Sequence, residues 1–132
     1  MLELGKGFAY VGRQFKLEVS DQEFYLDLLF YNYLLRRFIV IELKTTDFKP
    51  EYIGQLNFYM TAINRQVKNP ADEKTIGLLI CKGVNKTVVE YTLDETSQPT
   101  AVAAFKLPAE LQEQLPDQEQ IIPLLSLWQK YN

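Results

Sequence analysis

The chain has 132 residues, a formal net charge of −3, no histidine and 47% hydrophobic residues. This length and composition predict one folded domain over residues 1–132, and the lack of histidine excludes Ser-His-Asp and Cys-His catalytic sites. Cys81 is the only cysteine, which excludes an internal disulfide and favours a cytoplasmic setting. The chemistry that remains uses carboxylates, lysines and hydroxyls, and it suits hard cations such as Mg²⁺ or Mn²⁺.

The acidic residues are unevenly distributed. Residues 1–93 contain 12 Lys and Arg against 11 Asp and Glu, whereas residues 94–132 contain 2 against 6. A net negative charge is not typical of a nucleic-acid-binding protein, but the first 93 residues are nearly balanced, so charge leaves such a partner open. No apolar run approaches the roughly 20 residues that span a bilayer, and no signal peptide is visible, so we expect no membrane contact.

The first third of the chain reads as a helix end followed by strands. Residues 1–4 resemble the last turn of a helix, which predicts that the chain is the C-terminal part of a longer protein. Short turns separate the strands that follow, and this arrangement indicates an antiparallel meander. The predicted strands are 8–19, with a bulge at Gly12, 23–31 and 36–44.

A helix over 51–68 is predicted next, because Pro50 is well placed at a helix start and apolar residues recur with helical spacing. The elements predicted after it are strands 75–82 and 87–93, an extended segment 101–105, and helices over 110–114 and 121–131. This order predicts a mixed α/β fold with a central sheet flanked by helices, in which strand 75–82 returns beside strand 36–44 by a right-handed crossover.

Three charged residues stand in apolar strands. Asp27 lies within residues 24–30, and Glu42 and Lys44 close the run 38–44. A hairpin centred on residues 34–35 would bring Asp27 opposite Glu42. Two adjacent carboxylates repel each other unless a proton or cation lies between them, so a divalent cation is expected there, with Lys44 acting on water or phosphate. A solvated strand face with a weak surface ion pair is the simpler alternative.

The spacing Asp27 … Glu42-Leu43-Lys44 resembles the PD-(D/E)XK nuclease signature, although Leu26 stands in place of the proline of that name. Glu3 resembles the acid that this superfamily often carries on its first helix. The resemblance implies that Asp27 and Glu42 hold metal, that Lys44 acts on the water or the transition state, and that Glu3 supports them.

The predicted helix adds Gln55 and Tyr59, which resemble the Gln-X-X-X-Tyr element of RecB-like members and share one helix face. Gln55 is therefore a further candidate site residue. The chain is most similar to the C-terminal nuclease domain of YhcG-type proteins. The stretches that carry this similarity are residues 3–8, 24–31, 41–44 with 48–51, 54–57 and 75–81.

The resemblance implies a restriction-endonuclease-like fold and a Mg²⁺- or Mn²⁺-dependent nuclease that acts on DNA in restriction, repair or recombination. It also implies a helical N-terminal region in the longer protein. The alternatives are a catalytically silent module with the same fold that binds nucleic acid or protein, and a subunit interface that forms a homodimer through its aromatic strands.

Overall fold

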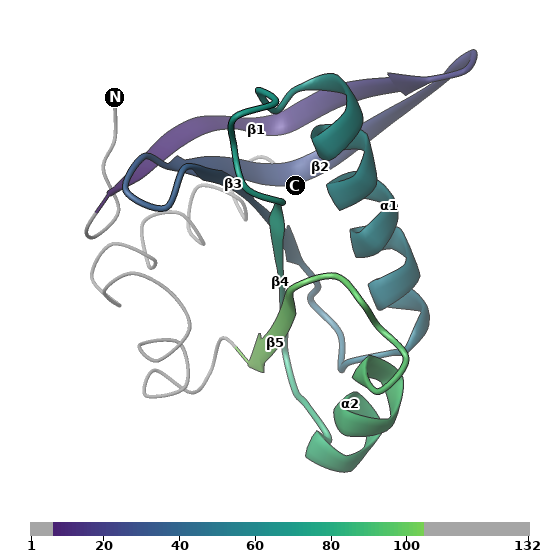
Figure 1. Cartoon of the computed structure of the whole chain (residues 1–132). Coiled ribbons are helices and arrows are strands. Elements are labelled where there is room, and N and C mark those ends of the chain that lie inside the picture. The colour runs from purple at the N-terminus through teal and green to yellow at the C-terminus, as the bar shows by residue number, and fades with distance from the viewer. Residues whose placement is uncertain (1–6, 105–132) are drawn as a thin grey trace.

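A computed structural model describes residues 7–104 of the chain, and its strands form a single five-stranded sheet in the order β1-β2-β3-β4-β5 (Figure 1). The elements in chain order are β1 (Phe8–Val19), β2 (Gln22–Asn32), β3 (Arg37–Leu43), α1 (Glu51–Gln66), β4 (Ile76–Cys81), α2 (Lys86–Leu93) and β5 (Thr100–Ala104). Within the described residues no helix is long and apolar enough to cross a membrane.

The first three strands form the predicted antiparallel meander, and the β1–β2 register shifts between Tyr10 and Gly12, where the bulge was expected. The β2–β3 hairpin is centred on Leu34-Leu35, as predicted. The Asn32 side chain holds this turn, because its Oδ1 accepts hydrogen bonds from the backbone N–H groups of both leucines at 3.0 Å. Asx turns of this kind explain how two leucines can occupy a tight turn.

The far half of the β1–β2 hairpin forms a two-stranded arm. Strand β2 pairs with β3 only over residues 28–32, so its first half pairs with β1 alone. The arm lies against α1, where the Phe24 and Phe58 rings are 4.7 Å apart and Gln66 Nε2 donates to the Glu18 carbonyl at 2.8 Å. The helix therefore fixes the direction of the arm, which extends past α1 in Figure 1.

The second half of the sheet is parallel. Strand β4 pairs with β3 after the α1 crossover, as predicted, and β5 pairs with β4 after the α2 crossover. Helix α1 packs closely on β4 at Gly77, where a Cβ would clash with Met60 Sδ and the Leu56 side chain. Glycine at this position therefore lets the Met60 and Leu56 side chains of the helix lie directly on the strand.

One predicted element is wrong, because residues 86–93 form helix α2 and not a strand. The run Thr87-Val88-Val89 is β-branched, which favours a strand by propensity. Asn85 overrides that preference as an N-cap, since its side chain accepts from the N–H groups of Thr87 and Val88. Val89 and Leu93 then lie one helical turn apart and pack on the core.

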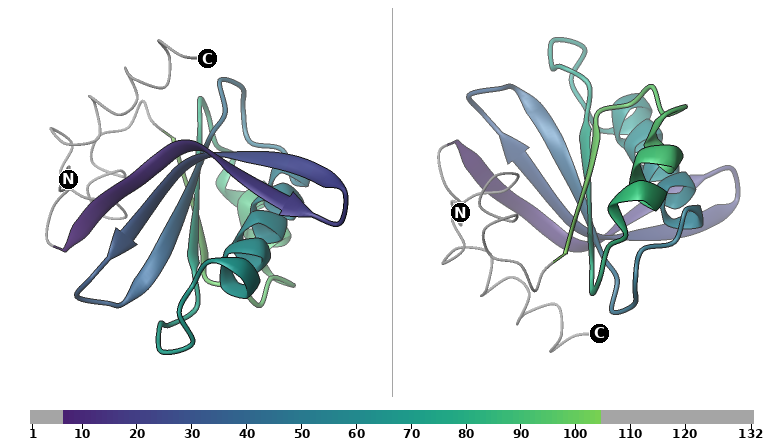
Figure 2. Two further views of the ribbon diagram at one scale, coloured as in Figure 1. Left: turned by 90° about the horizontal axis from the view of Figure 1, so that it is seen from above. Right: turned by 90° about the horizontal axis from the view of Figure 1, so that it is seen from below.

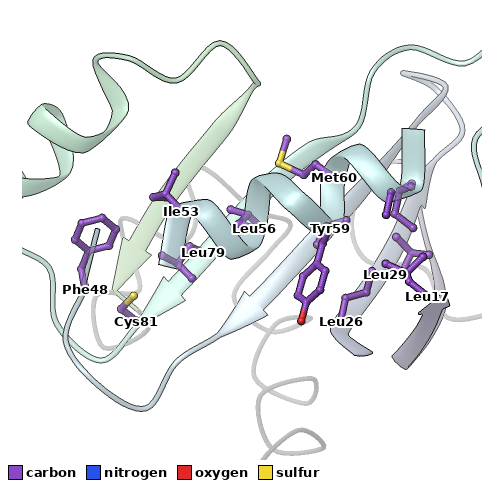
Figure 3. Packing of buried hydrophobic residues seen from close by; sticks show 13 residues of the cluster. Leu17, Leu26, Leu29, Phe48, Ile53, Leu56, Tyr59, Met60, Leu79 and Cys81 are labelled. Carbon is purple, nitrogen blue, oxygen red and sulfur yellow. The ribbon is translucent and has the colours of Figure 1, made fainter. Parts of the chain in front are cut away.

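Both helices lie on the same face of the sheet (Figure 2). Figure 3 shows the core that α1 makes with this face, which includes Leu26, Leu29, Leu56, Tyr59, Met60 and Leu79. The opposite face carries a second buried cluster that includes Leu28, Phe30, Ile39, Ile41, Leu43, Leu78 and Ile80. The alternation predicted for β3 is thus confirmed, with Val40 on the helix side and Ile39, Ile41 and Leu43 on the other.

The helix end predicted over residues 1–4, with Glu3, lies outside the described residues. So do the helices predicted over 110–114 and 121–131.

Candidate active site

Two carboxylates face each other where the β2–β3 ladder ends. The last regular pair is Leu28 with Ile41, and the same register places Asp27 opposite Glu42. The arrangement predicted from the hairpin centre is therefore present. Asp27 stands where the arm begins, and Glu42 stands one residue before the end of β3.

Each carboxylate is held by the backbone of the opposite strand. The Asp27 N–H donates to Glu42 Oε2 at 2.6 Å, and the Leu43 N–H donates to Asp27 Oδ2 at 2.9 Å. Side-chain oxygens thus take the place of backbone carbonyls at the point where the two strands separate. Backbone donors fix the position of a carboxylate well, because the strand that carries them is rigid.

Glu42 is buried to an unusual degree for an acid, with 3% of its surface exposed. Burial and, to a smaller extent, the negative charge of Asp27 raise the pKa of its carboxyl group to about 8. The Asp27 N–H and the Lys44 ammonium act in the opposite direction, by less. At neutral pH the side chain is therefore stable only with a proton or a nearby cation. This feature separates Glu42 from a glutamate on a solvated strand face.

The donor set fits a hard divalent cation. Hydrogen bonds from the backbone use one oxygen of each carboxylate, so Asp27 Oδ1 and Glu42 Oε1 retain coordinating capacity. In the described part of the chain no group of three or more His, Cys, Asp or Glu residues is placed to hold a metal. Two carboxylates suit Mg²⁺, which keeps several waters and shares its coordination with phosphate oxygens.

Lys44 joins this pair from the end of β3. Its Nζ donates to Gln55 Oε1 at 2.8 Å and lies 4.9 Å from the centroid of the Tyr52 ring. Gln55 Nε2 in turn donates to the Tyr59 hydroxyl at 3.3 Å. Helix α1 therefore orients the lysine through two side chains one turn apart, and the predicted candidates Lys44 and Gln55 are in direct contact.

Tyr59 connects the core to the carboxylates. Its ring is buried between α1 and the sheet (Figure 3). Burial raises the pKa of its hydroxyl, and the charges of Glu42 and Asp27 raise it further, while the Gln55 hydrogen bond lowers it. The hydroxyl is thus close enough to respond to both acids, and it stays protonated as a neutral donor.

Comparison with known proteins identifies the family of the chain that carries this pair of carboxylates. The YhcG PDDEXK nuclease domain matches residues 1–120 of the chain. The chain belongs to this family. The family expected from the sequence is therefore confirmed, and the chain is a nuclease domain of the PDDEXK type.

One curated protein and one solved structure are similar to this chain. The curated protein "Putative nuclease YhcG" of Escherichia coli (strain K12) is 35% identical over 121 residues, which are 92% of this chain and 31% of that protein. The chain thus spans less than a third of the length of that relative. The crystal structure of a repair endonuclease from Pyrococcus abyssi matches 73% of this chain and 37% of its own, with a TM-score of 0.51 and 14% identity. It shows a shared restriction-endonuclease-like fold, as expected.

Within the PDDEXK domain, four of the five candidates from the sequence form two contacting pairs, Asp27 with Glu42 and Lys44 with Gln55. Lys44 connects the pairs, because its charge lowers the pKa of Glu42. Glu3, the fifth, lies outside the described residues. Two further contacts were not foreseen. Gln14 Nε2 donates to Asp27 Oδ1 at 3.2 Å, and the Tyr52 ring lies beneath Lys44. The position of Tyr52, three residues before Gln55 on the same helix, was the available signal for the second contact.

Proposed function

We propose that this domain hydrolyses phosphodiester bonds of DNA with the help of Mg²⁺ or Mn²⁺. The observation that best supports the proposal is the buried Glu42 carboxylate opposite Asp27, with Lys44 at the next position on the same face of β3. A silent module that kept only the fold would have no need to bury an acid beside a second acid, because that arrangement is costly without a bound cation. Restriction, repair or recombination of DNA is the setting that we infer from the family.

Asp27 and Glu42 are the residues that would hold the cation, and Glu3 would add a carboxylate from the preceding segment. When bound, the cation would neutralise the two acids and stabilise the negative charge that develops on the phosphate. The protein fixes both acids beforehand through the Asp27 and Leu43 N–H groups, so little reorganisation is needed.

Lys44 would act at the reacting phosphate as an ammonium group, either orienting the attacking water or stabilising charge in the transition state. In hydrolysis the water oxygen forms a bond to phosphorus, the ester P–O bond breaks, and the departing oxygen takes up a proton. Gln55 accepts a hydrogen bond from Nζ and the Tyr52 ring lies beneath it, so two side chains of α1 hold the lysine in place. Its positive charge lowers the pKa of Glu42, which supports a role beside the acids where the phosphate would bind.

Calorimetry with Mn²⁺, read together with cleavage of supercoiled and linear duplex DNA and of RNA, tests this function. We expect binding at millimolar concentrations or below and cleavage of DNA by the 132-residue chain. Asp27→Asn and Glu42→Gln should each lose Mn²⁺ binding and lower the cleavage rate by about 100-fold or more, because each removes a charge that the cation needs. Asp21→Asn, on the exposed turn of the arm, is the matched control and should leave both unchanged.

Three results separate the alternatives. Cleavage of RNA in preference to DNA would overturn the substrate assignment. Metal binding without cleavage of any duplex would indicate that the activity needs a special substrate or the rest of a longer protein. Absence of Mn²⁺ binding at millimolar concentration would contradict the proposed site and favour a silent nucleic-acid-binding or interaction module.

A further inference from the structure

Gln14 has a backbone conformation that strands avoid. Its φ is +47°, and it lies inside β1. In residues 7–104 the other two non-glycine residues with positive φ are Ser20 and Arg36, and both are in turns between strands. A left-handed conformation costs free energy for any residue with a Cβ, and a turn is where it is normally found. No turn requires the strain at Gln14, and the bulge of β1 ends two residues before it, at Gly12.

The strained position is directly opposite the candidate metal ligand Asp27. The neighbouring pairs in the β1–β2 ladder are Arg13 with Leu28 and Phe15 with Leu26, which brackets Gln14 and Asp27 as partners. The Gln14 side chain is half-buried, and its Nε2 donates to Asp27 Oδ1 at 3.2 Å. Strain that persists beside a functional group is common where the strained residue positions that group.

The hydrogen bonds at Asp27 show what Gln14 adds. The Leu43 N–H holds Oδ2 from the β3 side, and the Gln14 amide holds Oδ1 from the β1 side. Contacts to both oxygens from opposite sides fix the plane of the carboxylate, which one contact would leave free to rotate. Each oxygen has two lone-pair sites, so these bonds leave capacity for a cation.

The neutral amide also explains why glutamine suits this position. A lysine or arginine opposite Asp27 would neutralise the carboxylate and compete with a divalent cation. An amide donates a hydrogen bond and leaves the negative charge in place. We therefore propose that Gln14 is a positioning residue that orients Asp27 for metal binding. This inference rests on the proposed function, because it takes Asp27 as a metal ligand.

Two substitutions in the full 132-residue chain separate the amide from the strain. Gln14→Met keeps the length of the side chain and the strained backbone but removes the hydrogen bond. Gln14→Gly removes the side chain and relieves the strain. Mn²⁺ dissociation constants are measured by calorimetry without DNA, and unfolding midpoints are measured in EDTA. Ser20→Gly is the control, because it relieves similar backbone strain at a turn far along the arm.

We expect both Gln14 variants to bind Mn²⁺ about 10-fold more weakly, as is typical when a group that orients a metal ligand is lost. The unfolding midpoint of Gln14→Gly should equal or exceed that of the wild type, and Ser20→Gly should keep the wild-type affinity for Mn²⁺. In cleavage assays the Mn²⁺ concentration for half-maximal rate should rise by a similar factor, while the rate at saturating Mn²⁺ stays within about 3-fold of wild type.

Wild-type affinity in both Gln14 variants would overturn the inference and leave the proposed function standing. So would a loss of affinity that is matched by a large fall in the unfolding midpoint of both variants, since that result would make the role purely structural. If the wild-type chain itself binds no Mn²⁺, the proposed function fails and the inference fails with it.

Discussion

The two faces of β3 differ in what they contribute to the molecule. Ile39, Ile41 and Leu43 are buried in the cluster on the face away from the helices. Phe38 and Val40 pack in the helix-side core on the other face, and Glu42 continues this face as a buried acid. Adjacent residues of one strand thus serve either packing or chemistry. Substitutions on the two faces should therefore separate stability from activity.

The largest effect is expected on the polar face, from Lys44→Met. Removing a group that stabilises developing charge should lower the cleavage rate by roughly 100- to 1,000-fold. The unfolding midpoint should change little, because methionine can still pack on the Tyr52 ring. Single-turnover cleavage at saturating Mn²⁺ measures this effect. Lys49→Met, which changes an exposed lysine nearby, is the control, and an equal loss there would point to general charge and not to the site.

On the apolar face, Ile39→Ala should destabilise the domain by about 3 kcal/mol, since it removes methylene groups from a buried cluster and leaves a cavity. Urea unfolding measures the change, with the exposed Val88→Ala as the control for a small aliphatic truncation. The cleavage rate per folded molecule should be unchanged at low temperature. A rate that falls with stability intact would mean that the two faces are not independent.

A third prediction concerns pH and Glu42. Its pKa rises from 4.5 to about 8 in the folded chain, so between these values the folded state holds a proton that the unfolded state lacks. Stability in EDTA should therefore fall as the pH rises through this window, by about 2 kcal/mol between about pH 5 and pH 7, and level off above pH 8.

Glu42→Gln removes the titrating group, and the pH dependence in this window should disappear with it. Urea unfolding of both proteins across the window gives the difference directly, and other titrating groups cancel in the comparison. A wild-type stability that rises with pH relative to the variant would contradict the burial argument.

The smallest effect is expected at Tyr52, which touches Lys44 only through its ring. Tyr52→Leu should lower the cleavage rate about 3-fold, as is typical of losing one exposed cation–π contact. Tyr52→Phe keeps the ring but loses the 2.5 Å hydrogen bond between its hydroxyl and Thr46 Oγ1. A phenylalanine variant as slow as the leucine variant would show that this hydroxyl, and not the ring, matters.

The β-meander and the Asp27–Glu42 pairing could be predicted because they depend on local patterns. Period-two alternation assigns each residue of β3 to a face, and the length of the hairpin sets its register. Once Asp27 and Glu42 were placed opposite each other, burial of the strand implied their electrostatic conflict. Helix α2 was missed for a local reason too, because the β-branched run at residues 87–89 outweighed the N-cap signal of Asn85.

The contacts of Gln14 and Tyr52 depend on features that the sequence displays only in part. The bulge between Tyr10 and Gly12 was predicted from Gly12, but the left-handed φ at Gln14 follows no turn signal. The approach of Tyr52 to Lys44 depends on how α1 is rotated over the sheet, which the packing of its whole apolar stripe decides. Such contacts follow only from the assembled tertiary structure.

The absence of a side chain at Gly77 also bears on how this domain can change over evolution. Residue 77 is not one of the site residues, yet a Cβ there would meet the Met60 and Leu56 side chains of α1, so these side chains or the helix would have to shift. If the helix shifted, Tyr52, Gln55 and Tyr59 would move with it, because they are carried on the same element. A substitution at position 77 could therefore be tolerated by a stabilised fold and still inactivate the enzyme. Selection on activity would then preserve a glycine that has no chemistry of its own.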